Sequence, residues 1–197
     1  MIEYRIATET ELQMVVETHI QCFPDYFLAS LGNKLLYSYY KCFFIERNLF
    51  AVAFDNGKMI GFAMGHLCPS EARQNFEREN AVLLFFRLLA LCIKLDKNAL
   101  ERCTSRLFRK KTAGNNLSFS AQADATLLSI GVLEEYRRQQ VASQLVAEFE
   151  SLLKQYHVKS YTSSVRKENV KIQAFYNRLG FIVIEEASDG IRYFKEI

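Results

Sequence analysis

The sequence is poor in the residues that mark long loops, disulfide frameworks and metal sites. Only two prolines and eight glycines occur in 197 residues, which indicates a compact chain with few long loops. The cysteines are odd in number, none forms a C-x-x-C pair and no secretory signal opens the chain, so we expect reduced thiols and a cytoplasmic location. They are Cys22, Cys42, Cys68, Cys92 and Cys103. No zinc-like spacing is present, and no metal is expected.

Neither charge nor hydropathy points to a nucleic acid or a membrane. The formal net charge is only +3 and there is no basic tail, which argues against nucleic-acid binding. The apolar run at 81–93 contains Arg87 and is shorter than the roughly 20 residues that span a bilayer, so a buried or interface-facing helix is expected there. Half of the residues are hydrophobic, and a chain of this length is expected to fold as one domain, 1–197.

Hydrophobic periodicity predicts that strands and helices alternate along the chain. Residues 2–7 alternate apolar and polar side chains, as a strand does, and Thr8 offers an N-cap to the following helix. The turn at Asn56-Gly57 predicts a hairpin between residues 48–54 and 58–66. Further helices are expected from Pro24, after Gly32, from Val141 and over 169–179, and further strands at 125–132, 159–165, 181–184 and 191–195.

The most informative stretch runs from a strand through a basic turn into a helix. Residues 127–132 are typical of a buried strand, a turn with Arg137 and Arg138 follows, and an apolar stripe at helical spacing begins at Val141. The first N–H groups of a helix have no partner within the helix, and its dipole favours negative charge there. This turn is therefore predicted to bind an anion, most naturally a phosphate or pyrophosphate.

A second motif runs from Asn169 to Phe181 and reads Asn-Val-Lys-Ile-Gln-Ala-Phe-Tyr-Asn-Arg-Leu-Gly-Phe. Together the two motifs, over 124–184, resemble the GNAT superfamily of acetyl-CoA-dependent N-acyltransferases. That family has an Arg/Gln-x-x-Gly-x-Gly/Ala loop before a helix, and later an Asn-led helix that ends in Tyr-x-x-x-Gly-Phe. The resemblance implies a GNAT-like α/β fold with a mixed, mostly antiparallel central sheet flanked by helices. The matching residues are Arg137, Val141, Ala142, Asn169, Tyr176, Gly180 and Phe181.

One position of the loop departs from the family pattern. Gln140 stands where the family usually has its first loop glycine. If the backbone there needs a positive φ, glutamine costs about 1 kcal/mol or more. If the position belongs to the first helical turn, little is lost, and we expect this second case.

The resemblance also implies how acetyl-CoA is held. Backbone N–H groups from Arg138 to Ser143 are expected to bind its phosphates, with the guanidinium groups of Arg137 and Arg138 as support. In the family the strand at 127–132 splays from its parallel neighbour at 159–165, which leaves unpaired amides for the pantetheine arm and the thioester oxygen. Gly131 is expected to let the cofactor approach closely. The predicted cofactor-binding residues are Ile130, Gly131, Val132, Arg137, Arg138, Gln139, Gln140, Val141, Ala142, Ser143, Asn169 and Tyr176.

Tyr176 is predicted to be the general acid, because a phenol with a pKa near 10 is protonated at neutral pH and can donate to a departing thiolate. A core aromatic is the alternative interpretation. Asn169 is expected to cap its helix and, by the resemblance, to bind the amide arm of the cofactor. Two residues are predicted as the general base: Asp124, acting through a water, and His66, whose pKa suits the task. A loop or N-cap aspartate and a strand-end histidine are their alternatives.

Residues 67–123 form an insertion, because the family typically has only a short connection before the cofactor-binding strand. Helices are expected at 71–96 and 99–109, with a break at Gly114. By the resemblance the insertion lies where acceptors enter, so it is either a wall or lid of the substrate site, or a helical pair that extends the core or packs in a dimer. The basic side chains near its end form a solvated face or attract an anionic acceptor: Arg106, Arg109, Lys110 and Lys111.

The predicted function is transfer of an acetyl group from acetyl-CoA to a primary amine of a small molecule or peptide, by direct attack in a ternary complex. Direct attack is implied by the family, because no nucleophile stands out. The alternative is a catalytically weak or inactive GNAT-like module that binds CoA or a partner. A longer acyl donor, with 81–93 lining its pocket, is a third hypothesis. A homodimer is left open.

Overall fold

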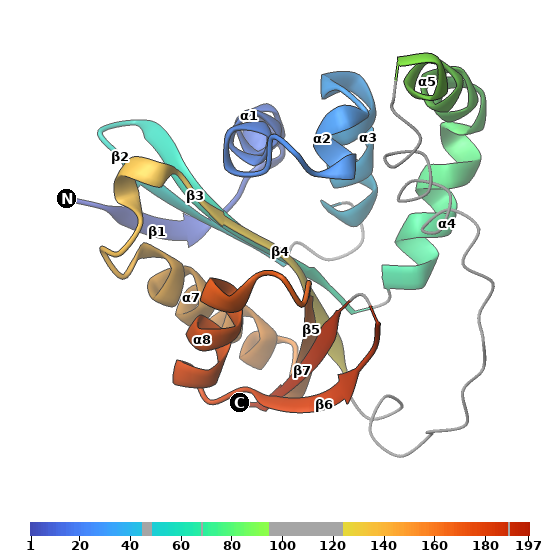
Figure 1. Ribbon diagram of the computed structural model, residues 1–197. Coiled ribbons are helices and arrows are strands. Elements are labelled where there is room, and N and C mark those ends of the chain that lie inside the picture. The colour runs from blue at the N-terminus through green and yellow to red at the C-terminus, as the bar shows by residue number, and fades with distance from the viewer. Residues whose placement is uncertain (45–48, 68, 95–123, 189) are drawn as a thin grey trace.

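The computed structural model describes residues 1–44, 49–67, 69–94, 124–188 and 190–197, which build one seven-stranded sheet flanked by helices (Figure 1). The strand order is β1-β2-β3-β4-β5-β7-β6, and the paired strands are antiparallel except β4 and β5, which are parallel. This confirms the predicted mixed, mostly antiparallel sheet. The strands are β1 (Glu3–Ile6), β2 (Phe50–Asp55), β3 (Lys58–His66), β4 (Ala125–Val132), β5 (Ser160–Val165), β6 (Ile182–Glu186) and β7 (Ile191–Glu196).

Helices cover both faces of the sheet and create two apolar cores (Figure 1). On one face α7 buries Leu145 and Phe149, and α8 lies beside it. On the other face α1 and α3 bury Leu12, Leu36 and Phe43. The helices are α1 (Leu12–Cys22), α2 (Phe27–Ser30), α3 (Asn33–Phe44), α4 (Pro69–Glu79), α5 (Ala81–Lys94), α7 (Val141–Gln155) and α8 (Val170–Arg178), with 3-10 turns η1 (Glu9–Glu11) and η2 (Glu134–Tyr136).

Local turn chemistry places the early elements where the sequence predicts them. The hairpin of β2 and β3 turns at Asn56 and Gly57, whose φ angles of 49° and 79° suit a two-residue turn with both central residues left-handed. Thr8 precedes η1, and its N–H donates to the Glu11 carboxylate at 2.7 Å. This hydrogen bond is part of a capping box at the N-terminal end of the helical segment.

The segment expected as one helix over 71–96 is two helices, α4 and α5. They meet at Asn80, whose side-chain amide donates to Ser38 Oγ at 2.8 Å and to the Phe76 carbonyl at 3.0 Å. An asparagine that bonds the backbone in this way favours a helix end. Among the predictions for this region, the helix at 99–109, Gly114, the basic cluster from Arg106 to Lys111, and Cys68 and Cys103 lie outside the described residues.

α5 is not buried, which removes one of the two interpretations of its apolar run. Val82, Phe85 and Phe86, on one helical face, are 71%, 63% and 61% exposed. Arg87 instead turns toward the protein, where its guanidinium donates to the Ser30 carbonyl at 2.7 and 3.0 Å. None of the helices within the described ranges has both the length and the apolar character that crossing a bilayer requires.

Candidate active site

β4 and β5 run side by side for three residue pairs and then diverge. Their pairing ends where Leu127 lies opposite Ser163. β4 continues along β3 to Val132, but its register shifts at Leu128, which has no opposite residue on β3. A bulge bends a strand and increases its twist. Because this bulge falls where β4 leaves β5, the two strands form a fork, whose apex we define as the Leu127–Ser163 pair.

The open edge of β4 presents two backbone amides to the fork. The Leu133 N–H donates to the Ile60 carbonyl of β3 at 2.9 Å. Successive N–H groups of a strand point to opposite edges. Counting back from Leu133, the amides of Ile130 and Val132 therefore point away from β3, toward the side that β5 has left. Ile130 and Val132 both belong to the predicted cofactor-binding residues, and unpaired amides on this strand are what the family resemblance implies.

Gln140 has a left-handed backbone, contrary to the expectation that it belongs to the first helical turn. Its φ is 63°, and α7 begins only at the next residue. Arg138 is left-handed as well, with a φ of 64°. Each such residue costs about 1–2 kcal/mol, because its Cβ crowds the following carbonyl oxygen. A glycine at position 140 would avoid this cost, so the loop reaches its tight geometry under strain.

The start of α7 offers free amides at the wide end of the fork. The first hydrogen bond within α7 runs from the Gln144 N–H to the Gln140 carbonyl at 3.1 Å. The N–H groups of Val141, Ala142 and Ser143 therefore have no acceptor within the helix. Together with the positive end of the helix dipole, they make this end of the fork suited to an anion.

Two side chains of the loop before α7 donate hydrogen bonds to nearby backbone carbonyls. Arg137 Nε donates to the Val132 carbonyl at 3.1 Å, which ties the loop to the open edge of β4. Gln139 Nε2 donates to the Glu135 carbonyl at 2.8 Å. Arg137 and Arg138 are both exposed, so they add positive charge near the free amides while Arg137 also shapes the turn.

The hydroxyl of Tyr176 reaches the apex of the fork. Its Oη lies 2.9 Å from Ser163 Oγ, and Ser163 in turn donates to the Leu127 carbonyl at 3.0 Å. Because the Ser163 hydroxyl already donates its proton to that carbonyl, the Tyr176 hydroxyl is the donor in its hydrogen bond with Ser163. The ring stacks on Phe181 with centroids 4.6 Å apart. Burial raises the pKa of Tyr176 to about 12, so the phenol is protonated at neutral pH.

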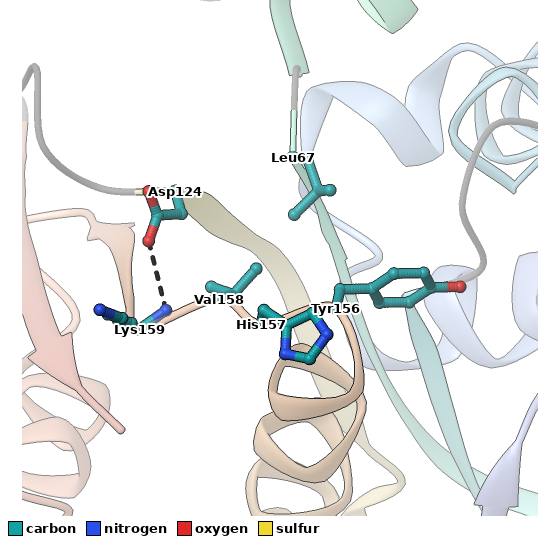
Figure 2. Close-up of a pocket in the computed structure, with 6 residues that line it drawn as sticks. All are labelled: Leu67, Asp124, Tyr156, His157, Val158 and Lys159. Carbon is teal, nitrogen blue, oxygen red and sulfur yellow. Dashed lines mark hydrogen bonds between the residues drawn. The ribbon is translucent and has the colours of Figure 1, made fainter.

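The two predicted bases lie beside the paired part of β4 and not at its open edge. Asp124 is exposed at the start of β4, where its Oδ2 accepts from the Lys159 N–H at 3.2 Å. Figure 2 shows it at a pocket lined also by Leu67, Tyr156, His157, Val158 and Lys159. His66 lies opposite Thr126, is buried and meets the Phe43 ring edge-on. A role for either as the base stays a prediction.

Two further predicted residues have clear local reasons for their identity. Asn169 caps α8, as expected, because its Oδ1 accepts from the Ile172 N–H at 3.3 Å. At Gly131 a Cβ would lie 3.1 Å from the rings of Phe23 and Phe62. The glycine was expected to admit the cofactor, but the space that a side chain would fill there is occupied by the end of α1.

A buried polar chain behind the fork was not predicted. His19 Nδ1 on α1 lies 2.7 Å from Tyr40 Oη on α3, and the side chain of Ser129 on β4 lies close to Tyr40. His19 is 2% exposed, and within the described ranges its Nε2 has no hydrogen-bond partner. The chain fastens both helices to the strand just after its bulge. A histidine and a tyrosine within apolar helical stripes are the only sequence signal for it.

Because burial lowers the pKa of His19 to about 4, the protein is expected to lose stability in mild acid. The unfolded chain, with a histidine pKa near 6.5, binds the proton first as the pH falls. The contribution is complete above pH 6.5 and is lost progressively down to pH 4. A pKa difference of this size corresponds to about 3 kcal/mol in the free energy of unfolding. Urea denaturation at pH 7 and pH 4 measures it.

His19→Gln is the matched control for this pH dependence, because glutamine can still pair with Tyr40 but does not titrate. The wild-type protein should lose about 3 kcal/mol more than the variant over this range. The comparison also cancels the contribution of every group that the two proteins share. Equal losses in the two proteins would show that His19 is not the group responsible.

Comparisons with known proteins bear on the family and the fold. A sequence profile of the acetyltransferase (GNAT) family matches residues 12–181. Among solved structures, the chain is similar to the ribosomal-protein-S18-alanine N-acetyltransferase of Escherichia coli, with 17% identity, a TM-score of 0.61 and coverage of 100% of this chain and 94% of that one. It is also similar to the PaiA N-acetyltransferase of Thermoplasma acidophilum in complex with coenzyme A, with 15% identity, a TM-score of 0.56 and coverage of 100% and 99%.

A third similar structure is the polyamine N-acetyltransferase of Drosophila melanogaster, with 14% identity, a TM-score of 0.60 and coverage of 100% of both chains. At these identities the likeness shows the fold alone. A comparison with curated protein sequences finds no match.

Proposed function

Since the chain belongs to the acetyltransferase (GNAT) family, we propose that it transfers an acetyl group from acetyl-CoA to a primary amine by direct attack in a ternary complex. The fork between β4 and β5 is the observation that carries the proposal. It has the Tyr176 hydroxyl at its apex and the free amides of α7 at its wide end. This arrangement suits a molecule with a reactive group at one end and phosphates at the other.

Each part of the fork has a distinct task in this proposal. When bound, acetyl-CoA supplies the thioester carbon that the amine attacks and the thiolate that leaves. The amides of α7 hold the phosphates. Ile130 lies two residues nearer the apex than Val132, so we assign its N–H to the thioester oxygen and that of Val132 to the pantetheine arm. A fixed N–H aimed at this oxygen stabilises the negative charge that develops during attack.

Tyr176 is proposed to stabilise the leaving sulfur, and the pKa of its phenol determines whether it transfers its proton or only donates a hydrogen bond. A phenol with a pKa of about 12 holds its proton more tightly than an alkyl thiol, whose pKa is near 8.5. Complete transfer to the thiolate would be uphill by about 5 kcal/mol. To assist, the Tyr176 hydroxyl turns its one proton from Ser163 Oγ to the sulfur and donates a hydrogen bond there, and solvent supplies the proton that the thiolate finally takes up. The proton of the attacking ammonium leaves through water, and Asp124 and His66 remain predicted acceptors for it.

The second candidate function is a module that binds CoA without turnover. Neither predicted base, Asp124 or His66, lies at the open edge of β4, which favours binding without turnover. The left-handed backbone of Arg138 and Gln140 strains the loop and is expected to weaken CoA binding in either function. Gln140→Gly removes this strain and is expected to tighten acetyl-CoA binding.

Thermal unfolding with acetyl-CoA, CoA and ATP, followed by an assay of thiol release with a panel of amines, tests the proposal. At about 100 times Kd a ligand specific to the native state adds about 2.7 kcal/mol, which raises Tm by about 5–10 °C for a chain of this size. The proposal requires this rise with acetyl-CoA and CoA but not ATP, and thiol release with at least one amine. A rise without release favours the binding module, and no rise even in Gln140→Gly contradicts both functions.

A further inference from the structure

Residues 23–26, which connect α1 to α2, cross the fork on the face opposite α7 and α8, and we call them the bridge. At one side Phe23 and Cys22 lie on Gly131 of β4, where a Cβ would be 3.1 and 3.2 Å from their atoms. At the other side the guanidinium carbon of Arg166, just past the end of β5, lies 4.1 Å from the centroid of the Tyr26 ring. The rings of Phe23 and Tyr26 are 5.1 Å apart. This bridge thus connects the two arms of the fork.

The backbone that carries Arg166 is held firmly. Its carbonyl accepts from the Asn169 N–H at 3.0 Å and from Gln173 Nε2 at 3.3 Å. Gln173 Nε2 also donates to the Lys167 carbonyl at 2.7 Å. Arg166 therefore presents its side chain to the bridge from a fixed position, which reduces the entropy that a ligand would have to overcome.

The guanidinium of Arg166 has no carboxylate partner among the residues that the structure describes. The side chain is half-buried. Lys167 beside it is 3.9 Å from Glu186, while Asp25 and Glu168 are exposed nearby. Stacking on Tyr26 occupies a face of the guanidinium and uses none of its N–H donors. Those donors match the two oxygens of a carboxylate.

We propose that Arg166, positioned by Tyr26, binds a carboxylate of the acceptor, so that the substrate class is amino carboxylates such as free amino acids. This inference rests on the proposed function. The phosphates lie at α7, which covers one face of the sheet, so the acceptor reaches the thioester from the other face. The bridge and Arg166 lie on that side, where an amine in the fork and a carboxylate at Arg166 can belong to one small molecule.

Thiol-release kinetics with matched pairs of acceptors test this substrate class. Amino carboxylates of increasing chain length are compared with their carboxamides, which keep the amine but lose the charge. For the best acceptor we expect kcat/KM to be on the order of 10²-fold higher for the carboxylate than for the carboxamide. Arg166→Gln should abolish this preference by lowering the value for the carboxylate alone. Equal use of the two acceptors by the wild-type protein would overturn the proposal.

The control variant is Arg178→Gln, which removes the same charge from the exposed end of α8 and should keep the preference. A phosphate of the cofactor is the other anion that Arg166 could bind. Acetyl-CoA and its 3′-dephospho form separate the two sources. Arg166→Gln could raise the KM of acetyl-CoA equally with every acceptor, while the wild-type protein and the variant have the same KM for the dephospho form. That result would mean that Arg166 binds the 3′-phosphate, and the carboxylate assignment would be wrong.

Calorimetric titration of the same amino carboxylates into the protein saturated with CoA keeps the test independent of turnover. If Arg166→Gln weakens binding of the amino carboxylate by on the order of 10²-fold, the inference is supported, whether or not thiol is released. The absence of thiol release would contradict the proposed function alone. Equal binding by the wild-type protein and Arg166→Gln contradicts the inference and leaves the proposed function standing.

Discussion

Tyr176→Phe is expected to lower kcat by on the order of 10²-fold while leaving the Kd of acetyl-CoA nearly unchanged. The hydroxyl lies at the apex of the fork, 2.9 Å from Ser163 Oγ, where the leaving sulfur is proposed to sit. The substitution removes one donor that acts only as negative charge develops on sulfur. Single-turnover thiol release and equilibrium binding, measured on the same preparation, separate the two effects.

The structure offers a close control for this substitution. Tyr193 on β7 belongs to the same aromatic cluster, with its ring 5.4 Å from that of Tyr176, and is 1% exposed. Tyr193 lies opposite Ser163 across the β5–β7 pair, so Tyr193→Phe removes a phenol from the same cluster but leaves the Tyr176 hydroxyl in place, and it should leave kcat within about twofold. Similar losses of kcat in both variants would mean that packing of the cluster, and not the Tyr176 hydroxyl, sets the rate.

Most elements of the fold could be predicted because their signals are local. The turn at Asn56-Gly57, the cap at Asn169 and the apolar stripe of α7 each depend on residues a few positions apart. The family resemblance then supplied the mixed, mostly antiparallel sheet with its parallel strands at 127–132 and 159–165, which the strand pairing confirms. The matched profile over 12–181 confirms the family. The sequence also predicted that 81–93 is helical. It could not show which way the helix faces, since Arg87 turns inward only because the Ser30 carbonyl is there to accept from it.

The details of the site depend on contacts that no short window contains. The bulge at Leu128 lies within an unbroken strand-like run, so its position follows from pairing with β3 and β5. The left-handed backbone of Gln140 is imposed by the approach to α7, against the preference of glutamine itself. The chain of His19, Tyr40 and Ser129 joins three elements that meet only in the folded protein. These are the points at which local patterns and the folded site diverge.

Ile130→Pro is expected to lower kcat by about 10²–10³-fold, because it deletes the N–H assigned to the thioester oxygen. The amide points away from β3, so no ladder hydrogen bond with that strand is lost. The ring fixes φ, and we expect a loss of about 1–3 kcal/mol in unfolding free energy, which thermal unfolding reports separately. Thiol release at saturating acetyl-CoA then measures the step in which charge develops.

Val132→Pro places the same change two residues further along the same edge, at the amide assigned to the pantetheine arm. It should weaken acetyl-CoA binding, and it should lower kcat far less than Ile130→Pro does, because the arm is bound equally before and during the reaction. If both variants lost the same factor in kcat at equal stability, the division of labour along β4 would be wrong. If only Ile130→Pro lost kcat, the reacting carbonyl would be located near the apex, within reach of Tyr176.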